Sequence, residues 1–511
     1  MTSTVMPAIL PSSIGPAAIA VSPTLAANEL MAARQRRGDP VLPLAFGEAG
    51  LPAHPSLRRA LAGAAGQTGY GPVAGQASLR EAAAGYWERR GLRTDPDAIV
   101  CGPGSKALLF GLMLAIGGDV AVPRPSWVSY AAQASLIGAR PWFVDIRPGE
   151  GGVPDPARLG VAVRAARAEG HQIRSVILTL PDNPTGTLAS TATIRDLCQV
   201  AEEHNLIIIS DEIYRDLVHE PSGTCVARGA GEAAGAAGIS EAGTTGAGEA
   251  AGVAMDGRAA VVAGAGEMAV THGAGTSGPG GSAGAGAAGA ATLFTSPAAI
   301  APGRTIVTTA LSKSLALGGW RIGVARLPGD DAARSQGQSL RQRLRARLLG
   351  IGSEIWSAPA APIQQAATFA FSDPPELTER IALSRRLHRD VARAVADRFT
   401  VAGARVPAPQ AAFYLYPDFG PVRDLLRTRH DVTTSDELAG LLLRRHGMGV
   451  LPGSAFGEDP HELRLRVATG LLYGDADEQR EAALGAPSAR EVPWIAASLA
   501  RIGEVLDAVT G

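Results

Sequence analysis

The chain has 511 residues, too many for one ordinary hydrophobic core, so we expect two or three domains or a large enzyme subunit and exclude a single small domain. The formal net charge of -1 gives no general attraction to nucleic acid or to an anionic membrane, so small molecules are the expected ligands. Three cysteines without a CxxC pair indicate neither a disulfide framework nor a zinc site, which fits a reducing cytoplasm.

The N-terminal segment lacks a basic stretch and is interrupted by prolines, and no later segment offers about 18 uninterrupted apolar residues. We therefore expect a cytoplasmic protein that is neither secreted nor inserted in a membrane. Residues 1–55 are expected to form an N-terminal arm and part of a small domain.

Helical and strand patterns alternate between residues 71 and 220. This alternation predicts an α/β fold with a mostly parallel sheet that helices cover on both faces. Such folds bind ligands beyond the carboxyl ends of their strands, so candidate site residues are sought there. The apolar runs that predict strands cover residues 97–101, 119–122, 175–180 and 206–210.

Residues 221–291 form a tract of Gly and Ala with scattered Ser, Thr and Glu and without aromatic residues. Such a composition cannot build a core, so we predict a disordered surface insertion. Gly246, Gly248 and Ala251 match a GxGxxA phosphate-loop pattern, but in so glycine-rich a tract the match is expected by chance.

A further strand is predicted at residues 304–309, before a basic helix around residues 341–349. The arginines of this helix are more typical of a solvated face than of a nucleic-acid patch, because the whole chain is not basic. Residues 56–350 are predicted to form a large domain, and the remaining residues, 351–511, a smaller α+β domain. Its elements are helices at 377–398, 435–445 and 493–510 and strands at 412–416 and 463–467.

The run SKSLALGGWRIG places the amine of Lys313 and the guanidinium of Arg321 near each other after a strand. A lysine there can form a Schiff base with an aldehyde once its pKa falls from about 10.4 in a cationic, partly desolvated site. Arg321 can bind a phosphate with two hydrogen bonds. A surface lysine is the alternative interpretation, and the companion residues at other strand ends disfavour it.

Two neighbouring strand ends carry polar residues. Asn183 lies in the turn NPTG, and Asp211 ends the strand LIIIS, followed by Tyr214 in DEIY. A carboxylate placed there can keep the nitrogen of a bound pyridine ring protonated, so that the ring accepts electrons. Tyr214 and Asn183 can form hydrogen bonds to an oxygen substituent of the same ring, its O3′. For Asp211 alone, a helix cap is an equally good interpretation.

The segment GPGSKALLFGL opens a predicted helix after the strand at 97–101. Free N–H groups at Gly102, Gly104 and Ser105, together with the helix dipole, favour a phosphate there. Trp127, which follows another strand, is a candidate for stacking on a flat ring, although a lone aromatic residue is more often part of a core.

Together these segments resemble the class I and II aminotransferases of the fold-type-I pyridoxal-phosphate enzymes, in particular the bacterial aspartate aminotransferase subgroup. The motifs NPTG, DEIY, SKxxxxxGWRIG and RLRVAT carry this resemblance, which leaves out only the Gly/Ala tract and the extreme N-terminus. It implies a large domain with a mostly parallel, seven-stranded sheet, a smaller α+β domain and pyridoxal 5′-phosphate as cofactor. It also implies a homodimer, because Tyr70 matches a tyrosine that reaches the phosphate of the neighbouring subunit.

The resemblance implies a role for each matching residue. Lys313 matches the Schiff-base lysine and proton shuttle, and Arg464 matches the arginine that binds the substrate α-carboxylate. Arg464 alternatively suits a strand surface where it pairs with Glu462, and Arg466 has no predicted role.

The predicted catalytic residue is Lys313. The predicted cofactor-binding residues are Tyr70, Gly104, Ser105, Lys106, Trp127, Asn183, Asp211, Tyr214, Ser312, Lys313 and Arg321. The predicted substrate-binding residues are Gly47, Lys106, Asn183 and Arg464.

The chain departs from the family pattern in two places. Tyr214 and Lys313 are much further apart than in most members, and the Gly/Ala tract accounts for most of the difference. A long loop there is tolerable because loop closure cost grows only logarithmically with length. Ala310 stands where some relatives carry a phosphate-binding hydroxyl, so either one phosphate bond is lost or Ser312 replaces it.

The expected reaction moves an amino group from an amino acid to a 2-oxo acid in two half-reactions. Lys106 resembles a lysine that meets the distal carboxylate of acidic substrates, which favours aspartate or glutamate, although an exposed lysine in a first helical turn is an equally good interpretation. A lyase could use the same residues. A regulator of this fold would need an N-terminal DNA-binding domain, for which the segment before the family match is short and lacks a helix-turn-helix pattern.

Overall fold

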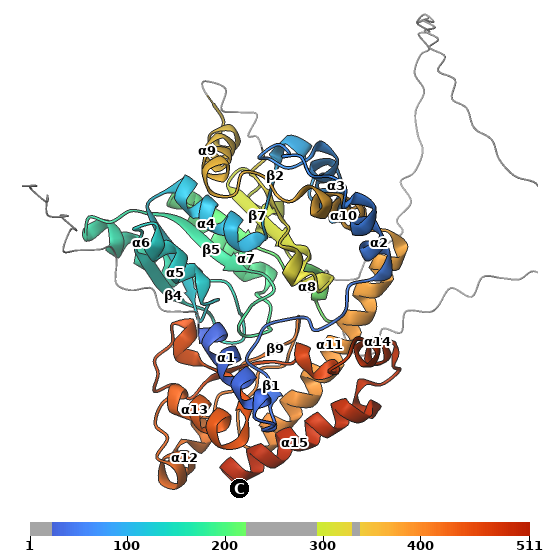
Figure 1. Cartoon of the computed structure of the whole chain (residues 1–511). Helices are drawn as coiled ribbons and strands as arrows, with labels where there is room; N and C mark the ends of the chain where they lie inside the picture. The colour runs from blue at the N-terminus through green and yellow to red at the C-terminus, as the bar shows by residue number, and fades with distance from the viewer. Residues whose placement is uncertain (1–22, 221–293, 330–337) are drawn as a thin grey trace, which may run out of the picture. The chain divides into compact units, whose positions relative to one another are not determined.

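The computed structural model describes residues 23–220, 294–329 and 338–511 (Figure 1). The predicted insertion at residues 221–291 and its GxGxxA match lie outside the described residues. The described ranges form one compact unit. Within the described ranges, no helix is long and apolar enough to cross a membrane.

A seven-stranded sheet forms the centre of the fold, in the order β2-β8-β7-β6-β5-β3-β4. The strands from β7 to β4 in this order are parallel, and β8 runs antiparallel to both of its neighbours. The prediction of an α/β fold with a mostly parallel, seven-stranded sheet is confirmed. The strands are β2 (Ile99–Gly102), β3 (Asp119–Arg124), β4 (Pro141–Asp145), β5 (Ile173–Thr179), β6 (Ile207–Asp211), β7 (Thr305–Ala310) and β8 (Gly323–Arg326).

Both faces of this sheet are buried, which explains why its strands are continuous apolar runs rather than alternating patterns. In β6, Ile209 packs toward one set of helices and Ile208 toward the other, because successive side chains of a strand point to opposite faces. One face is covered by α4 (Ser105–Ile116), α5 (Ser129–Leu136) and α9 (Leu340–Ile355); the other by α2 (Pro55–Ala64), α3 (Ala77–Glu88), α6 (Pro156–Ala168), α7 (Thr191–Glu203) and α10 (Ala361–Phe371).

Some of the helices begin at residues whose side chains satisfy free backbone N–H groups. Asp155 accepts a hydrogen bond from the backbone N–H of Ala157 at the start of α6. Ser339 and Gln342 form a capping box at the start of α9, where each side chain bonds the backbone of the other residue. These local signals fix where α6 and α9 begin.

The C-terminal elements pack around a second apolar core, which includes Phe399, Phe419, Ile495 and Ile502. Figure 1 shows α11 and α15, which contact each other. A three-stranded antiparallel sheet has the order β11-β12-β9. The elements are α11 (Pro375–Val401), β9 (Tyr414–Leu415), α12 (Arg423–His430), α13 (Ser435–His446), β11 (Leu451–Pro452), β12 (Leu465–Ala468), α14 (Asp477–Gly485) and α15 (Pro493–Thr510).

The N-terminal described segment joins these C-terminal elements. It contains α1 (Pro23–Arg36) and β1 (Leu42–Pro43), and β1 pairs in parallel with β10 (Met448–Gly449). Helix α10, which follows the predicted domain limit at residue 350, packs against α2 and α3. The predicted domain limits at residues 55 and 350 stay a prediction.

Candidate active site

A cavity of about 580 Å³ lies beyond the carboxyl ends of β5, β6 and β7. Parallel strands bring their ends to one edge of the sheet, so side chains far apart in the sequence meet there. The cavity holds most of the predicted site residues. These are Gly47, Ser105, Lys106, Trp127, Asn183, Asp211, Tyr214, Ser312, Lys313 and Arg321.

Lys313 lies in the short helix α8 (Leu311–Ser314), directly after β7. Its Nζ donates a hydrogen bond of 2.5 Å to the backbone oxygen of Gly47. Burial lowers the pKa of Lys313 to about 8, and the nearby cations Arg466 and Arg321 act in the same direction, while Glu48 opposes them. A substantial fraction of this amine is therefore neutral near physiological pH, as a nucleophile or proton acceptor must be.

Asp211 is the last residue of β6 and is 3% exposed. Its two carboxylate oxygens accept hydrogen bonds of 3.1 Å from the hydroxyls of Tyr130 and Thr308. Burial raises the pKa of Asp211 to about 6, although both hydroxyls favour the charged form. In the described part of the chain this carboxylate has no ion-pair partner, so the site offers a buried anion without its cation.

Tyr214 and Asn183 lie beside Asp211 on the wall of the cavity. The hydroxyls of Tyr214 and Tyr414 are 2.7 Å apart and share a hydrogen bond. Asn183 is 5% exposed, and its Oδ1 has no hydrogen-bond partner among the described residues. A buried amide oxygen without a partner is costly, which indicates that this wall is built for a polar ligand.

The start of α4 forms a cradle with Arg321. Gly104 has φ +86°, and a Cβ at Gly104 would lie 2.5 Å from Nη2 of Arg321. A Cβ at Gly323 would lie 2.7 Å from the backbone nitrogen of Ser105. Both glycines therefore permit close approach of backbone and guanidinium. Free N–H groups of a helix start beside a guanidinium suit a phosphate.

Arg321 itself has a left-handed backbone conformation, with φ +53°. A residue other than glycine pays of order 1 kcal/mol or more for this conformation, which persists where the surroundings impose it. Hydrogen bonds from its guanidinium to the backbone oxygens of Gly318, at 2.9 Å, and Pro103, at 3.3 Å, hold it against the start of α4. Ser312, which is 8% exposed, lines the cavity from α8.

Lys106 and Trp127 lie together in the same cavity. The Nζ of Lys106 is 5.1 Å from the centre of the Trp127 ring, within the range of a cation–π contact. Burial lowers the pKa of Lys106, and the charge of Arg321 lowers it further. Lys106 thus lines the cavity, and it is also an exposed residue in the first turn of α4, as the alternative interpretation described.

The structure does not bring Arg464 to this cavity, unlike the other predicted substrate-binding residues, Gly47, Lys106 and Asn183. Arg464 lies instead in a separate cavity, where its guanidinium is 2.6 Å from Glu458, 3.6 Å from Glu462 and 3.9 Å from Asp418. Three carboxylates already neutralise it. The alternative interpretation of Arg464, as a residue paired with Glu462, describes its surroundings better.

Arg466 occupies the cavity instead and is 2% exposed. Its guanidinium lies 5.2 Å from the centre of the Tyr414 ring and donates a hydrogen bond to the backbone oxygen of Ala45. No carboxylate forms an ion pair with it in the ranges that the structure describes. Burial lowers the pKa of Arg466. A buried cation without an anion is costly and indicates a binding place for an anionic group.

The chain around the two arginines shows how Arg466 enters the cavity while Arg464 does not. The backbone N–H of Arg464 bonds the oxygen of Glu462 at 2.8 Å in a tight turn, and β12 begins only at Leu465. Arg464 still bridges Asp418 in the register of β9 and β12, but its side chain lies beside Asp418, Glu458 and Glu462 rather than in the cavity. The sequence offered one signal, a second arginine at Arg466 inside a run of apolar strand residues, and this signal was not used.

Two further predicted residues lie outside the cavity wall. Gly104 contributes through its contact with Arg321, as described above. Tyr70 is 97% exposed in the single chain, so its predicted contact with a neighbouring subunit stays a prediction. The structure also adds residues that the sequence did not single out, namely Glu48, Tyr130, Thr179, Thr308, Tyr414 and Arg466.

Comparison with known proteins agrees with this geometry. The family described as "Aminotransferase class I and II" matches residues 41–252 and 271–472. The chain belongs to this family, as the motifs predicted, and members of the family use pyridoxal phosphate.

Among the proteins whose sequences resemble this chain are bacterial aspartate aminotransferases. The chain is 26% identical to the probable aspartate/prephenate aminotransferase of Thermus aquaticus, over 88% of this chain and 92% of that protein. It is 27% identical to the aspartate aminotransferase of Geobacillus stearothermophilus, over 89% of this chain and 94% of that protein.

Solved structures show the same fold. The aspartate aminotransferase of Thermus thermophilus with maleate superposes with a TM-score of 0.67 at 23% identity and covers 96% of this chain and 97% of its own. The aspartate aminotransferase of Rhizobium meliloti gives a TM-score of 0.67 at 20% identity, with 97% and 99% covered.

Proposed function

We propose that this chain transfers an amino group from an amino acid to a 2-oxo acid with pyridoxal 5′-phosphate bound in the cavity of Lys313. One observation carries the proposal. The cavity combines a buried amine with a lowered pKa, a buried carboxylate without a cation and a buried guanidinium without an anion, at Lys313, Asp211 and Arg466. Each of these three groups lacks the partner that a bound cofactor and an amino acid would supply.

The residues present fit the cofactor. Asp211 suits a protonated ring nitrogen, because a cation there would pair with the buried carboxylate. Asn183 and Tyr214 offer polar groups to a ring hydroxyl, and Arg321 with the start of α4 suits the phosphate. When bound, pyridoxal phosphate supplies an aldehyde that joins an amine and a ring that accepts electrons from the substrate carbon.

The chain's own residues then bind the substrate and move its proton. Lys313 can accept a proton at Nζ and return it, because burial keeps a fraction of the amine neutral. The backbone oxygen of Gly47 orients this Nζ through the 2.5 Å hydrogen bond. We assign the substrate α-carboxylate to Arg466 and not to Arg464, since only Arg466 is both in the cavity and free of carboxylates among the described residues.

A second carboxylate on the substrate would meet Lys106. The cations that line the cavity are Lys106, Lys313, Arg321 and Arg466, and the last three are used by the cofactor and the α-carboxylate. The whole sequence contains two lysines, Lys106 and Lys313, among its 47 basic residues, and both line this cavity. In a chain that otherwise uses arginine, this placement favours a functional Lys106. We therefore propose aspartate or glutamate as the amino donor.

The pair of arginines tests the proposal. Arg466→Lys keeps the positive charge but loses the planar fork that binds a carboxylate with two hydrogen bonds. Hydrogen bonds to charged groups contribute about 1.5–3 kcal/mol, so we expect kcat/KM for amino acids to fall by roughly 10- to 150-fold. Steady-state kinetics with aspartate and 2-oxoglutarate measures this change.

Arg464→Lys is the matched control, because it makes the same chemical change two positions away and outside the cavity. We expect its kcat/KM to stay within about threefold of the unmodified enzyme, since the lysine keeps the positive charge beside Glu458 and Asp418 and lies outside the cavity. A larger loss in Arg464→Lys than in Arg466→Lys would overturn the assignment of the carboxylate.

A further inference from the structure

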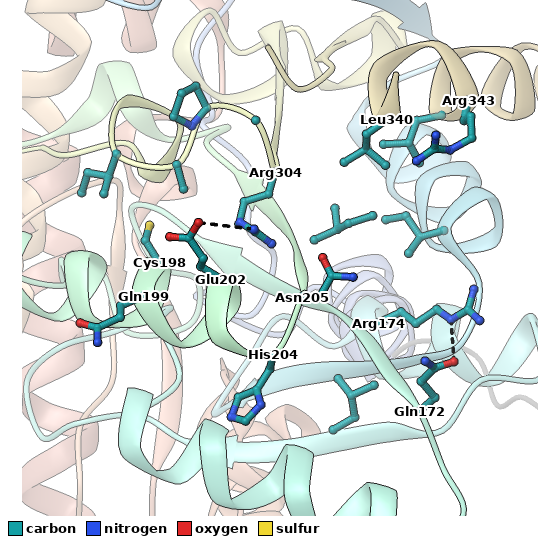
Figure 2. Close-up of a pocket in the computed structure, with 18 of the residues that line it drawn as sticks. Gln172, Arg174, Cys198, Gln199, Glu202, His204, Asn205, Arg304, Leu340 and Arg343 are labelled. Atoms are coloured by element: carbon teal, nitrogen blue, oxygen red, sulfur yellow. Dashed lines mark hydrogen bonds and ion pairs between the residues drawn. The ribbon is translucent and has the colours of Figure 1, made fainter. Parts of the chain in front are cut away.

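A second cavity, of about 920 Å³, lies at the opposite end of the large sheet (Figure 2). Ile173 and Ile207, the first residues of β5 and β6, line it together with the loop before β7. Thr179, the last residue of β5, lines the proposed cofactor cavity. The two cavities are thus separated by the length of β5, about 20 Å at the usual rise of a strand.

The lining of this second cavity is strongly basic. Among the described residues, it carries six arginines and a single acidic residue, Glu202. The whole chain is balanced, with 47 basic and 48 acidic residues, so the excess is local. We call this the arginine cavity; its arginines are Arg167, Arg174, Arg195, Arg304, Arg343 and Arg347.

Backbone contacts hold several of these guanidiniums at the wall. Arg304 donates hydrogen bonds of 3.2 Å to the oxygens of Ala201 and Leu206, and Arg347 donates one of 2.9 Å to the oxygen of Ala115. These oxygens lie at or near the carboxyl ends of α7 and α4. A guanidinium has five N–H donors, so the backbone bonds leave donors for a ligand.

Carboxylates neutralise little of this charge. Within the described part of the chain, the one ion pair of these arginines is the contact of 3.9 Å between Arg304 and Glu202, whose side chain is 78% exposed. In the described ranges the other five arginines form no ion pair. In Figure 2, Arg343 and Arg174 both lie to the right of Arg304, and Asn205 lies between Arg304 and Arg174. Five of the six arginines are exposed and Arg304 is partly buried, so their positive charge gathers around an open hollow.

Part of the wall is apolar. Ile116, Ile173, Ile207 and Leu344 line the same space as the arginines. The basic helix predicted from the sequence contributes Arg343 and Arg347, so these two arginines belong to a concave lining as well as to a solvated helix face. Small-molecule sites commonly have volumes of about 300–1,000 Å³ and combine apolar walls with a few convergent polar groups.

We propose that the arginine cavity binds a small organic polyphosphate. Guanidinium groups pair with phosphate oxygens through two parallel hydrogen bonds, and several of them converge here. The apolar wall suits a ring or another uncharged part of the same molecule. A hollow of this size fits a small molecule better than a nucleic-acid duplex, whose phosphates follow an extended surface. The proposal does not depend on the amino-transfer reaction.

The test uses the enzyme loaded with pyridoxal phosphate, so that the phosphate cradle near Arg321 is filled. Calorimetric titration with ATP should show binding, and Arg174→Gln/Arg343→Gln should weaken it about tenfold or more. The control Arg58→Gln/Arg429→Gln removes the same charge from exposed positions on α2 and α12, where neither side chain forms a hydrogen bond or ion pair with described residues, and should bind ATP as the unmodified enzyme does.

Two results would overturn the proposal. One is the absence of ATP binding by the loaded enzyme up to millimolar concentration. The other is equal weakening in the cavity variant and in the control, which would indicate attraction to overall charge rather than to this cavity. Amino-transfer kinetics of both variants serves as a check of the fold, and both should keep the activity of the unmodified enzyme.

Discussion

At the scale of single residues, Lys313 has the property that the proposed chemistry most depends on. An amine in water has a pKa of about 10.4, whereas burial lowers the pKa of Lys313 to about 8. Lowering the pKa of an amine increases its neutral fraction at a given pH. Near pH 7 about a tenth of Lys313 would be neutral, compared with less than a thousandth for an ordinary lysine.

This shift predicts how the apoenzyme captures pyridoxal phosphate as pH changes. The rate should rise about tenfold per pH unit below pH 8 and level off above it, because only the neutral amine attacks an aldehyde. Stopped-flow absorbance measures the rate, and borohydride reduction followed by peptide mass analysis identifies the lysine, of which the chain has two. A rate that still rises tenfold per unit between pH 9 and pH 10 would show that Lys313 titrates as an ordinary amine.

Sequence reasoning found the residues that a strand places directly. Asp211 and Asn183 follow apolar runs, and the strand ends they occupy meet in the structure. It missed Tyr414, because nothing local indicates that this residue of β9 reaches the hydroxyl of Tyr214. It chose Arg464 over Arg466 because no local pattern separates two arginines that are two residues apart and pair along the same ladder.

At the scale of elements, long apolar or periodic segments were predicted within a few residues. The strand predicted at 206–210 is β6, and the helix predicted at 493–510 is α15. The short strands β4 and β8 were not predicted. β8 has four residues, and its antiparallel place between β2 and β7 comes from tertiary pairing that no sequence period encodes.

The helix α4 allows a sharp test of the phosphate cradle, because a glycine of positive φ flanks each end. Gly104→Ala strains the backbone and would place its Cβ 2.5 Å from Arg321, so we expect affinity for pyridoxal phosphate to fall about tenfold. Gly117→Ala introduces a similar strain, at φ +69° and ψ 177°, with no atom within 4 Å of the new Cβ. Fluorescence titration of the apoenzymes measures both affinities.

Both variants should lose thermal stability, because an alanine resists these backbone angles. Only Gly104→Ala should lose cofactor affinity. Equal affinity in Gly104→Ala and the unmodified chain would show that the start of α4 does not hold the phosphate.

At the scale of the whole molecule, we propose a homodimer in which Tyr70 reaches the cofactor phosphate of the partner subunit. Tyr70 is 97% exposed in one chain, which is unusual for a large aromatic side chain and consistent with a buried place in an assembly. The sequence predicted the fold class, but whether two chains assemble depends on a surface that one chain does not specify.

Sedimentation of the loaded enzyme should give twice the mass of one chain. Tyr70→Phe removes one hydroxyl, so affinity for pyridoxal phosphate should fall by roughly 2- to 12-fold, as expected for a neutral hydrogen bond of about 0.5–1.5 kcal/mol. The variant should still sediment as a dimer. A fully active monomer, or a Tyr70→Phe variant of unchanged affinity, would contradict the shared site.

The most direct test of the central claim is a single half-reaction followed by absorbance. The purified enzyme, loaded with pyridoxal phosphate, is mixed with one amino acid at a time and no 2-oxo acid. We expect aspartate and glutamate to convert the cofactor from its aldehyde to its amine form, more efficiently than alanine or the aromatic amino acids, and Lys313→Ala to remain folded without this conversion. Release of ammonia and pyruvate without the amine form would contradict amino transfer and identify a lyase.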